Sequence, residues 1–71
     1  MSFPDKVVRY DDSVLPVMVK IAQVLRNGDR RATDLFAEVE STGISAFMEA
    51  MECLYALRKI EMENGVVHYV A

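Results

Sequence analysis

The sequence predicts an α+β fold of the winged helix-turn-helix class, with three helices followed by a C-terminal β-hairpin that forms the wing. Three segments carry apolar residues at helical spacing, and an Asn-Gly pair between two alternating segments near the C-terminal end indicates a tight hairpin. The length of 71 residues leaves room for one domain, which we expect to span residues 1–71.

The N-terminal part of the chain is predicted to contain an arm and a first helix. Residues 1–12 include a short β-prone run and are expected to form an extended arm or a short strand. Ser13 is a suitable N-cap for a helix from Val14 to Arg26, in which Pro16 falls in the first turn. Asn27–Gly28 should end this helix, and we expect a polar connection to follow it.

Two further helices are predicted in the middle of the chain. Thr33 can cap a short helix over Asp34–Glu40, and Ser45 can cap a third helix that continues to Lys59. The third helix has one apolar stripe at helical spacing, which we expect to be buried: Phe47, Ala50, Met51, Leu54 and Leu57.

The C-terminal segment is predicted to be a hairpin of Ile60–Glu63 and Val66–Val70 around Asn64–Gly65. Counting outward from the two-residue turn pairs Glu63 with Val66, Met62 with Val67, Glu61 with His68 and Ile60 with Tyr69. One face is then apolar (Ile60, Met62, Val67 and Tyr69), and the other is mostly polar (Glu61, Glu63, Val66 and His68). We expect the terminal strand to leave an edge free for a strand of a partner.

Charge argues against DNA reading as the main function. The chain has 8 basic and 11 acidic side chains, a net charge of −3. A DNA-reading third helix should carry Arg, Lys, Asn or Gln, whereas this one carries Glu49 and Glu52. The alternative is a small dimeric DNA-binding regulator that contacts phosphates through Arg30 and Arg31, although a solvated loop is the favoured interpretation of these two residues.

Spare apolar side chains favour a protein partner instead. Met48 and Tyr55 lie seven residues apart near Glu52, just outside the buried stripe of the third helix. They either pack at the periphery of the core or supply adaptable contact area for a partner. Val19 on the polar side of the first helix and Val66 on the polar side of the hairpin extend this candidate interface. Whether these residues form one contiguous patch depends on the fold.

No pattern in the sequence indicates catalysis, a cofactor or a metal. Ser13, Thr33 and Ser45 are better explained as caps than as nucleophiles, and His68 as a cross-strand partner of Glu61 than as a ligand. The single Cys53 is expected to be a small apolar filler. We therefore expect a non-enzymatic protein.

Without a signal-peptide pattern or an apolar run of about 18 residues, we expect it in the cytoplasm with no membrane span.

Several segments resemble one bacterial family: Phe3–Lys6, Phe47–Met48, Leu54–Glu61 and Asn64–Gly65. They are similar to the small winged-helix middle components of ABC-three-component defence systems. The resemblance implies a non-enzymatic adaptor that joins or regulates an effector and an ATPase related to the chromosome-maintenance and double-strand-break-repair ATPases, in antiphage defence. Self-association and inhibition of a single protein are further expectations that the composition permits.

Overall fold

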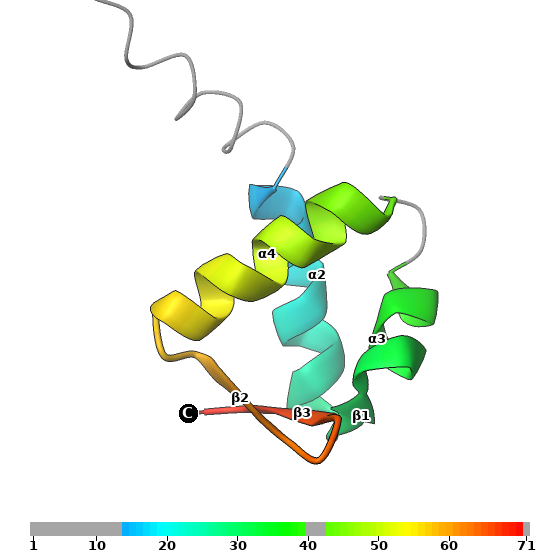
Figure 1. Ribbon diagram of the computed structural model, residues 1–71, viewed down its shortest axis with the longest axis vertical. Helices are drawn as coiled ribbons and strands as arrows, with labels where there is room; N and C mark the ends of the chain where they lie inside the picture. The colour runs from blue at the N-terminus through cyan, green and yellow to red at the C-terminus, as the bar shows by residue number, and fades with distance from the viewer. Residues whose placement is uncertain (1–13, 40–42, 71) are drawn as a thin grey trace, which may run out of the picture.

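Three helices and a three-stranded antiparallel sheet make up the described part of the chain, residues 14–39 and 43–70 of a computed structural model (Figure 1). The elements follow the order α2 (Leu15–Arg26), β1 (Arg30–Arg31), α3 (Ala32–Glu38), α4 (Ile44–Ala56), β2 (Ile60–Glu63) and β3 (Val66–Tyr69). The predicted α+β class is confirmed, and the topology is consistent with a winged helix. The expected arm over residues 1–12 lies outside the described residues, as does Ser13, and the N-cap of α2 is Val14 instead of the expected Ser13.

Helix α2 occupies the centre of the helical cluster and packs against α3, α4 and β3. Its residues Val17, Ile21 and Leu25 recur at helical spacing and are buried on one side, whereas Val19 on the opposite side is half-exposed. The helix ends as predicted, because Gly28 adopts a positive φ of 148° that few other residues tolerate.

The connection after α2 differs from the prediction. Arg30 and Arg31 do not form a solvated loop but the short strand β1, which pairs with Val67 and Val66 of β3. Helix α3 then begins at Ala32 with Arg31 as its N-cap, so Thr33 lies inside the helix and is not its cap. Two charged residues carry no hydrophobic alternation, so only the backbone pairing reveals this strand.

Helix α4 is shorter than predicted and begins two residues earlier. Gly43, not Ser45, is the N-cap, and the helix ends at Ala56 instead of Lys59. Arg58 adopts φ 61°, its N–H donates to the carbonyl of Tyr55, and the Lys59 N–H donates to the carbonyl of Leu54. This is a Schellman C-cap with arginine in the position that glycine usually occupies.

The early end of α4 removes one residue from the predicted buried stripe. Phe47, Ala50, Met51 and Leu54 are buried as expected, but Leu57 is 61% exposed and that prediction was wrong. Leu57 is the C-cap residue, so its side chain no longer continues the helical stripe onto the core.

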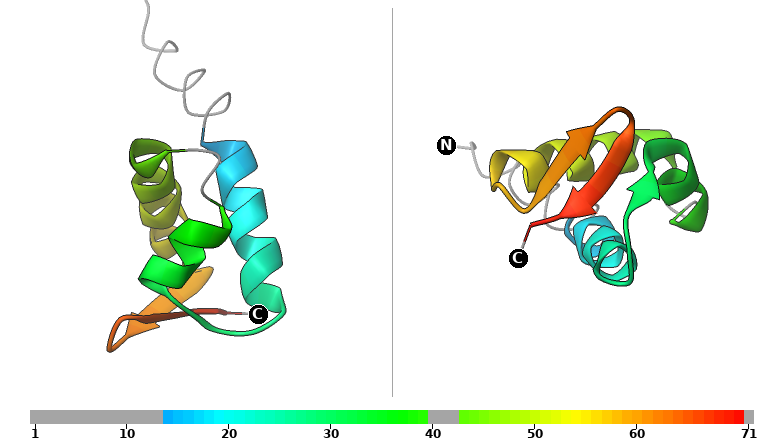
Figure 2. Two further views of the ribbon diagram at one scale, coloured as in Figure 1. Left: turned by 90° about the vertical axis from the view of Figure 1, so that its right-hand side faces the viewer. Right: turned by 90° about the horizontal axis from the view of Figure 1, so that it is seen from below.

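The hairpin register is confirmed at all four predicted pairs, and Asn64 and Gly65 both have positive φ, as a tight hairpin turn requires. The sheet order is β1-β3-β2, and the sheet lies across one end of the helical cluster (Figure 2). Because β3 is the central strand, the expected free edge on the terminal strand is wrong. Val67 pairs on both sides and its side chain is fully buried.

One hydrophobic core joins the helices to the sheet. Its aromatic part is the edge-to-face pair of Phe36 and Phe47, whose ring centroids lie 5.1 Å apart between α3 and α4. The buried residues come from every helix and from both hairpin strands: Val14, Val17, Ile21, Leu25, Leu35, Val39, Phe47, Ala50, Met51, Leu54, Ile60 and Val67. No helix in the described ranges is long and apolar enough to cross a membrane.

The left-handed conformation of Arg58 generates a prediction about stability. Arg58→Gly should raise the free energy of unfolding by about 0.5–1 kcal/mol, because relief of the side-chain clash exceeds the added entropy of the unfolded chain. Urea denaturation measures this change. Lys59→Gly is the matched control and should lower stability, since Lys59 has no positive φ to relieve. Equal destabilisation by both variants would contradict the prediction.

Candidate protein-interaction surface

An open groove of about 380 Å³ lies between α4 and the hairpin wing (β2 and β3), and we refer to it as the α4–wing groove. Helix α4 contributes one wall and β2 contributes the other. Five of its six lining residues are apolar or aromatic, and the sixth is a carboxylate: Met48, Met51, Glu52, Tyr55, Ile60 and Met62.

The groove exists because two buried residues position its walls. Met51 and Ile60 are 9% and 2% exposed and belong to the core, so they form the floor. Met48, Tyr55 and Met62 extend from the same two elements beyond the core and are 51%, 63% and 50% exposed. A connected set of large apolar side chains that remains in contact with water is typical of a binding surface.

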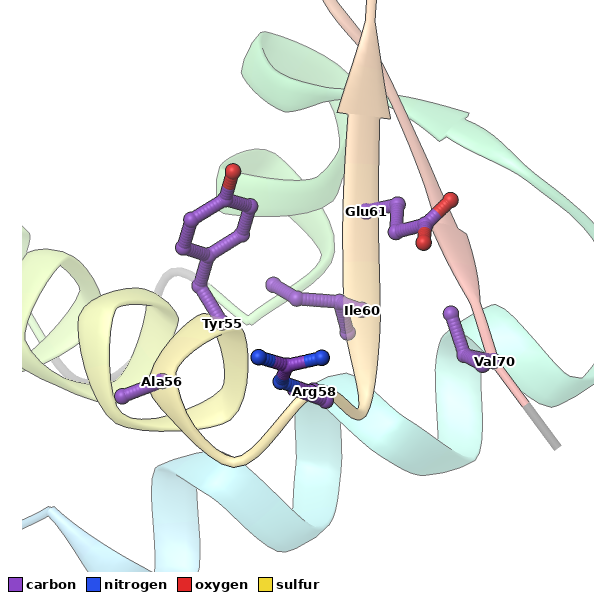
Figure 3. Close-up of a pocket in the computed structure, with 6 residues that line it drawn as sticks. All are labelled: Tyr55, Ala56, Arg58, Ile60, Glu61 and Val70. Carbon is purple, nitrogen blue, oxygen red and sulfur yellow. The ribbon is translucent and has the colours of Figure 1, made fainter.

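Tyr55 occupies the junction of three hollows. Besides the α4–wing groove, it lines one hollow with Arg58, Glu61 and Val70, and another with Glu61, Glu63 and His68. Figure 3 shows its ring beside β2, with the hydroxyl directed away from the end of α4. An aromatic ring with a polar tip at such a junction is the type of residue that dominates protein interfaces.

Of the five interaction residues proposed from the sequence, three line the groove and two do not. Met48, Glu52 and Tyr55 line the α4–wing groove together, as their spacing on one helix suggested. Val19 lies on the outward side of α2, and Val66 is partly buried beside the hairpin turn, and neither lines the groove.

Sequence reasoning missed two exposed apolar residues, of which Met62 lines the groove and Ile44 does not. Ile44 is 56% exposed at the start of α4, and its spacing of four residues from Met48 could have indicated it. Met62 was expected on the apolar face of the hairpin, but its position past the edge of the core leaves it exposed.

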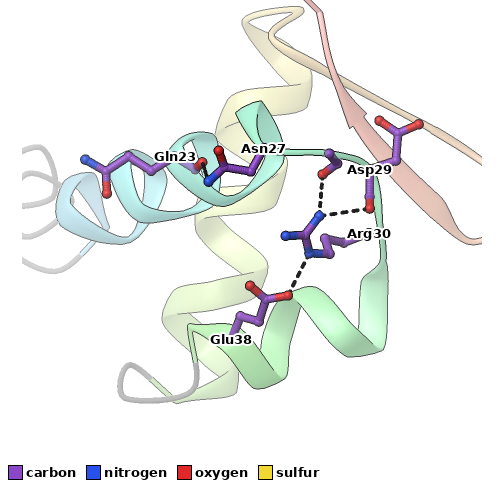
Figure 4. A network of polar contacts seen from close by, with 6 residues as sticks. Gln23, Asn27, Asp29, Arg30 and Glu38 are labelled. Atoms are coloured by element: carbon purple, nitrogen blue, oxygen red, sulfur yellow. Dashed lines mark hydrogen bonds and ion pairs between the residues drawn. The ribbon is translucent and has the colours of Figure 1, made fainter.

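Arg30, the alternative phosphate contact, is engaged within the fold (Figure 4). Its Nε donates to Glu38 Oε2 at 2.7 Å, and its Nη1 donates to the carbonyls of Gly28 and Asp29 at 2.8 and 3.1 Å. The guanidinium therefore joins the α2–β1 connection to α3. A Cβ on Gly28 would lie 3.2 Å from Nη1, so glycine also leaves room for this contact.

The remaining polar candidates have ordinary structural positions. His68 Nε2 lies 3.3 Å from Glu61 Oε1 across the hairpin, so the predicted cross-strand pair is present. Cys53 is partly buried against the core. No group of three His, Cys, Asp or Glu side chains suited to a metal ion occurs within residues 14–39 and 43–70.

The described elements thus define a small α+β domain, consistent with a winged helix, that carries an apolar groove beside its third helix. The chain belongs to the ABC-three component (ABC-3C) system Middle Component 7 family, whose model matches residues 3–67. This match confirms the resemblance to the ABC-3C middle components and makes the protein one component of a multi-component system with protein partners. No curated protein and no solved structure matches the chain.

The contacts of Arg30 generate a second prediction. Arg30→Gln should lower the free energy of unfolding by about 1 kcal/mol, because it removes a partly exposed ion pair and weakens the bonds to two carbonyls. Arg31→Gln, in the same strand but exposed, should change stability by less than about 0.5 kcal/mol. Equal effects of the two variants in urea denaturation would show that the Arg30 contacts do not stabilise the fold.

Proposed function

We propose that this protein is a non-enzymatic adaptor that binds other subunits of its ABC-3C system through the α4–wing groove. Its partners are the ATPase of the system, of the chromosome-maintenance and double-strand-break-repair type, and an effector. The adaptor joins or regulates these two subunits in the cytoplasm during antiphage defence. Family membership supports the presence of protein partners, and the exposed apolar groove supports the place where they bind.

The groove carries this proposal because its exposed residues are not needed to complete the core. Met48, Tyr55 and Met62 are at least half-exposed, although twelve other residues form a continuous buried cluster in the described part of the chain. Burying this surface against a partner would contribute about 25 cal/mol for each Å² of apolar area removed from water, and the part of this gain that exceeds the entropy and desolvation costs of association would stabilise a complex. A domain of this size gains stability from such contacts.

Charge favours a protein over DNA at this surface. Helix α4, the expected recognition helix, carries Glu49 and Glu52 and no Lys or Arg over Ile44–Ala56. Both carboxylates are exposed, so they would repel phosphates that approached the helix. The engagement of Arg30 with Glu38 further weakens the DNA-binding alternative.

Co-expression with the other two components of the same ABC-3C system tests the proposed function. The wild-type chain should co-purify in a stoichiometric complex. Tyr55→Ala and Met48→Ser should each weaken the affinity, with about a 30-fold loss for Tyr55 if it is a central anchor. Isothermal titration calorimetry with the purified partner measures the affinity.

Leu15→Ser on α2 is the matched control, because Leu15 is 49% exposed and does not line the groove. It should leave the affinity unchanged. Circular dichroism of each variant checks that the fold is retained. Failure of the wild-type chain to bind either component would contradict the proposed function, as would unchanged binding by both folded groove variants.

A further inference from the structure

Three carboxylates lie in or beside the exposed part of the α4–wing groove. Glu52 lines the groove itself, and Glu61 and Glu63 line the adjoining hollow, which shares Tyr55 and Met62 with it. All three carboxylates are on exposed residues. Arg58 lines a third hollow, which shares Tyr55 and Ile60 with the groove but has no methionine in its lining, on the side of Tyr55 towards the end of α4 (Figure 3). The rim beside the methionines is therefore acidic.

The apolar side chains of α4 form a ridge that suits a second helix. Ile44, Met48, Met51 and Tyr55 follow the i, i+4, i+7, i+11 pattern along one flank of α4. The last three line the α4–wing groove, and Ile44 continues the row to the start of the helix. Rows of side chains at this spacing pack into the grooves of another helix. A strand added to β2 is less suited, because β2 has four residues and carries two exposed carboxylates.

Methionine gives the groove an adaptable apolar surface. Met48, Met51 and Met62 are three of the five methionines in the chain, and all three line the groove. Flexible thioethers fit apolar anchors of different shapes, and methionine-rich grooves are used for amphipathic helices.

We propose that the α4–wing groove binds an amphipathic helix of a partner protein, whose apolar anchors are flanked by Lys and Arg. The inference rests on the proposed function and adds the chemistry of the docking segment. Apolar anchors would contact Met48, Tyr55 and Met62, and the basic flanks would lie opposite Glu52 on one side and Glu61 and Glu63 on the other. A second copy of this chain is a poor occupant, because its own acidic α4 would bring like charges together.

Two synthetic helical peptides test the charge preference. Each has about 18 residues, or about five helical turns, with Leu at i, i+3, i+7 and i+10. One carries Lys at the flanking positions and its twin carries Glu. Fluorescence anisotropy with the full chain should show the Lys peptide binding at least about tenfold more tightly than the Glu peptide. Raising the salt concentration should reduce this difference.

Variants of Glu52 test whether this carboxylate causes the preference for the Lys peptide. Glu52→Gln should weaken Lys-peptide binding by about threefold and Glu52→Lys by about tenfold, while Glu-peptide binding improves for Glu52→Lys. Asp29→Asn is the matched control, because Asp29 is exposed next to β1, at the opposite edge of the sheet from β2, and it should have no effect. Tyr55→Ala should weaken both peptides.

The outcomes separate this inference from the proposed function. Equal binding of the two peptides, tighter binding of the Glu peptide, or no binding of either would overturn the basic-helix inference. Loss of the native partner in Tyr55→Ala with no effect of Glu52→Lys would also overturn it, yet leave the adaptor function standing. A dimer in sedimentation equilibrium that Met48→Ser dissociates would assign the groove to a second copy.

Discussion

The pairing of β3 with strands on both of its sides is the constraint on which this fold depends. Val67 pairs with Arg30 and with Met62, and its fully buried side chain belongs to the same core as α2. An isolated two-stranded hairpin is marginally stable in water, and a third strand with a packed face makes it independently stable. The double pairing therefore fixes β2 beside α4, and the α4–wing groove exists because these two elements cannot separate without exposing the core.

Sequence patterns predicted the parts of this fold that local rules determine. The Asn64–Gly65 turn fixed the hairpin register, because positive φ at both turn residues permits one close pairing. Helical spacing correctly indicated the buried side of α2 and most of the buried stripe of α4. The same spacing placed Met48, Glu52 and Tyr55 on one flank of α4, which correctly predicted half of the residues that line the groove.

Other features depend on contacts that have no local pattern. Strand β1 consists of two arginines and is defined by its partner, so no periodicity marks it. At the end of α4, Arg58 takes the left-handed conformation that glycine usually adopts, so no glycine marks this helix end in the sequence. Leu57 is exposed because the helix ends before it. The exposure of Met62 depends on where the core ends beneath the wing, which is a tertiary property. The sequence therefore predicted the α4 side of the groove but not the exposed Met62 on its β2 side.

The wing is joined to α3 near its turn, where the Ala32 N–H donates to the carbonyl of Gly65 at 3.0 Å. At its base the Val70 N–H donates to the carbonyl of Lys59 at 2.8 Å, which extends the β2–β3 pairing by one step. The hairpin therefore cannot move independently of α3. A pull on its tip would pass directly to the first turn of α3 and from there to the aromatic pair of Phe36 and Phe47. Mechanical load on the tip of the wing would thus reach the contact between α3 and α4.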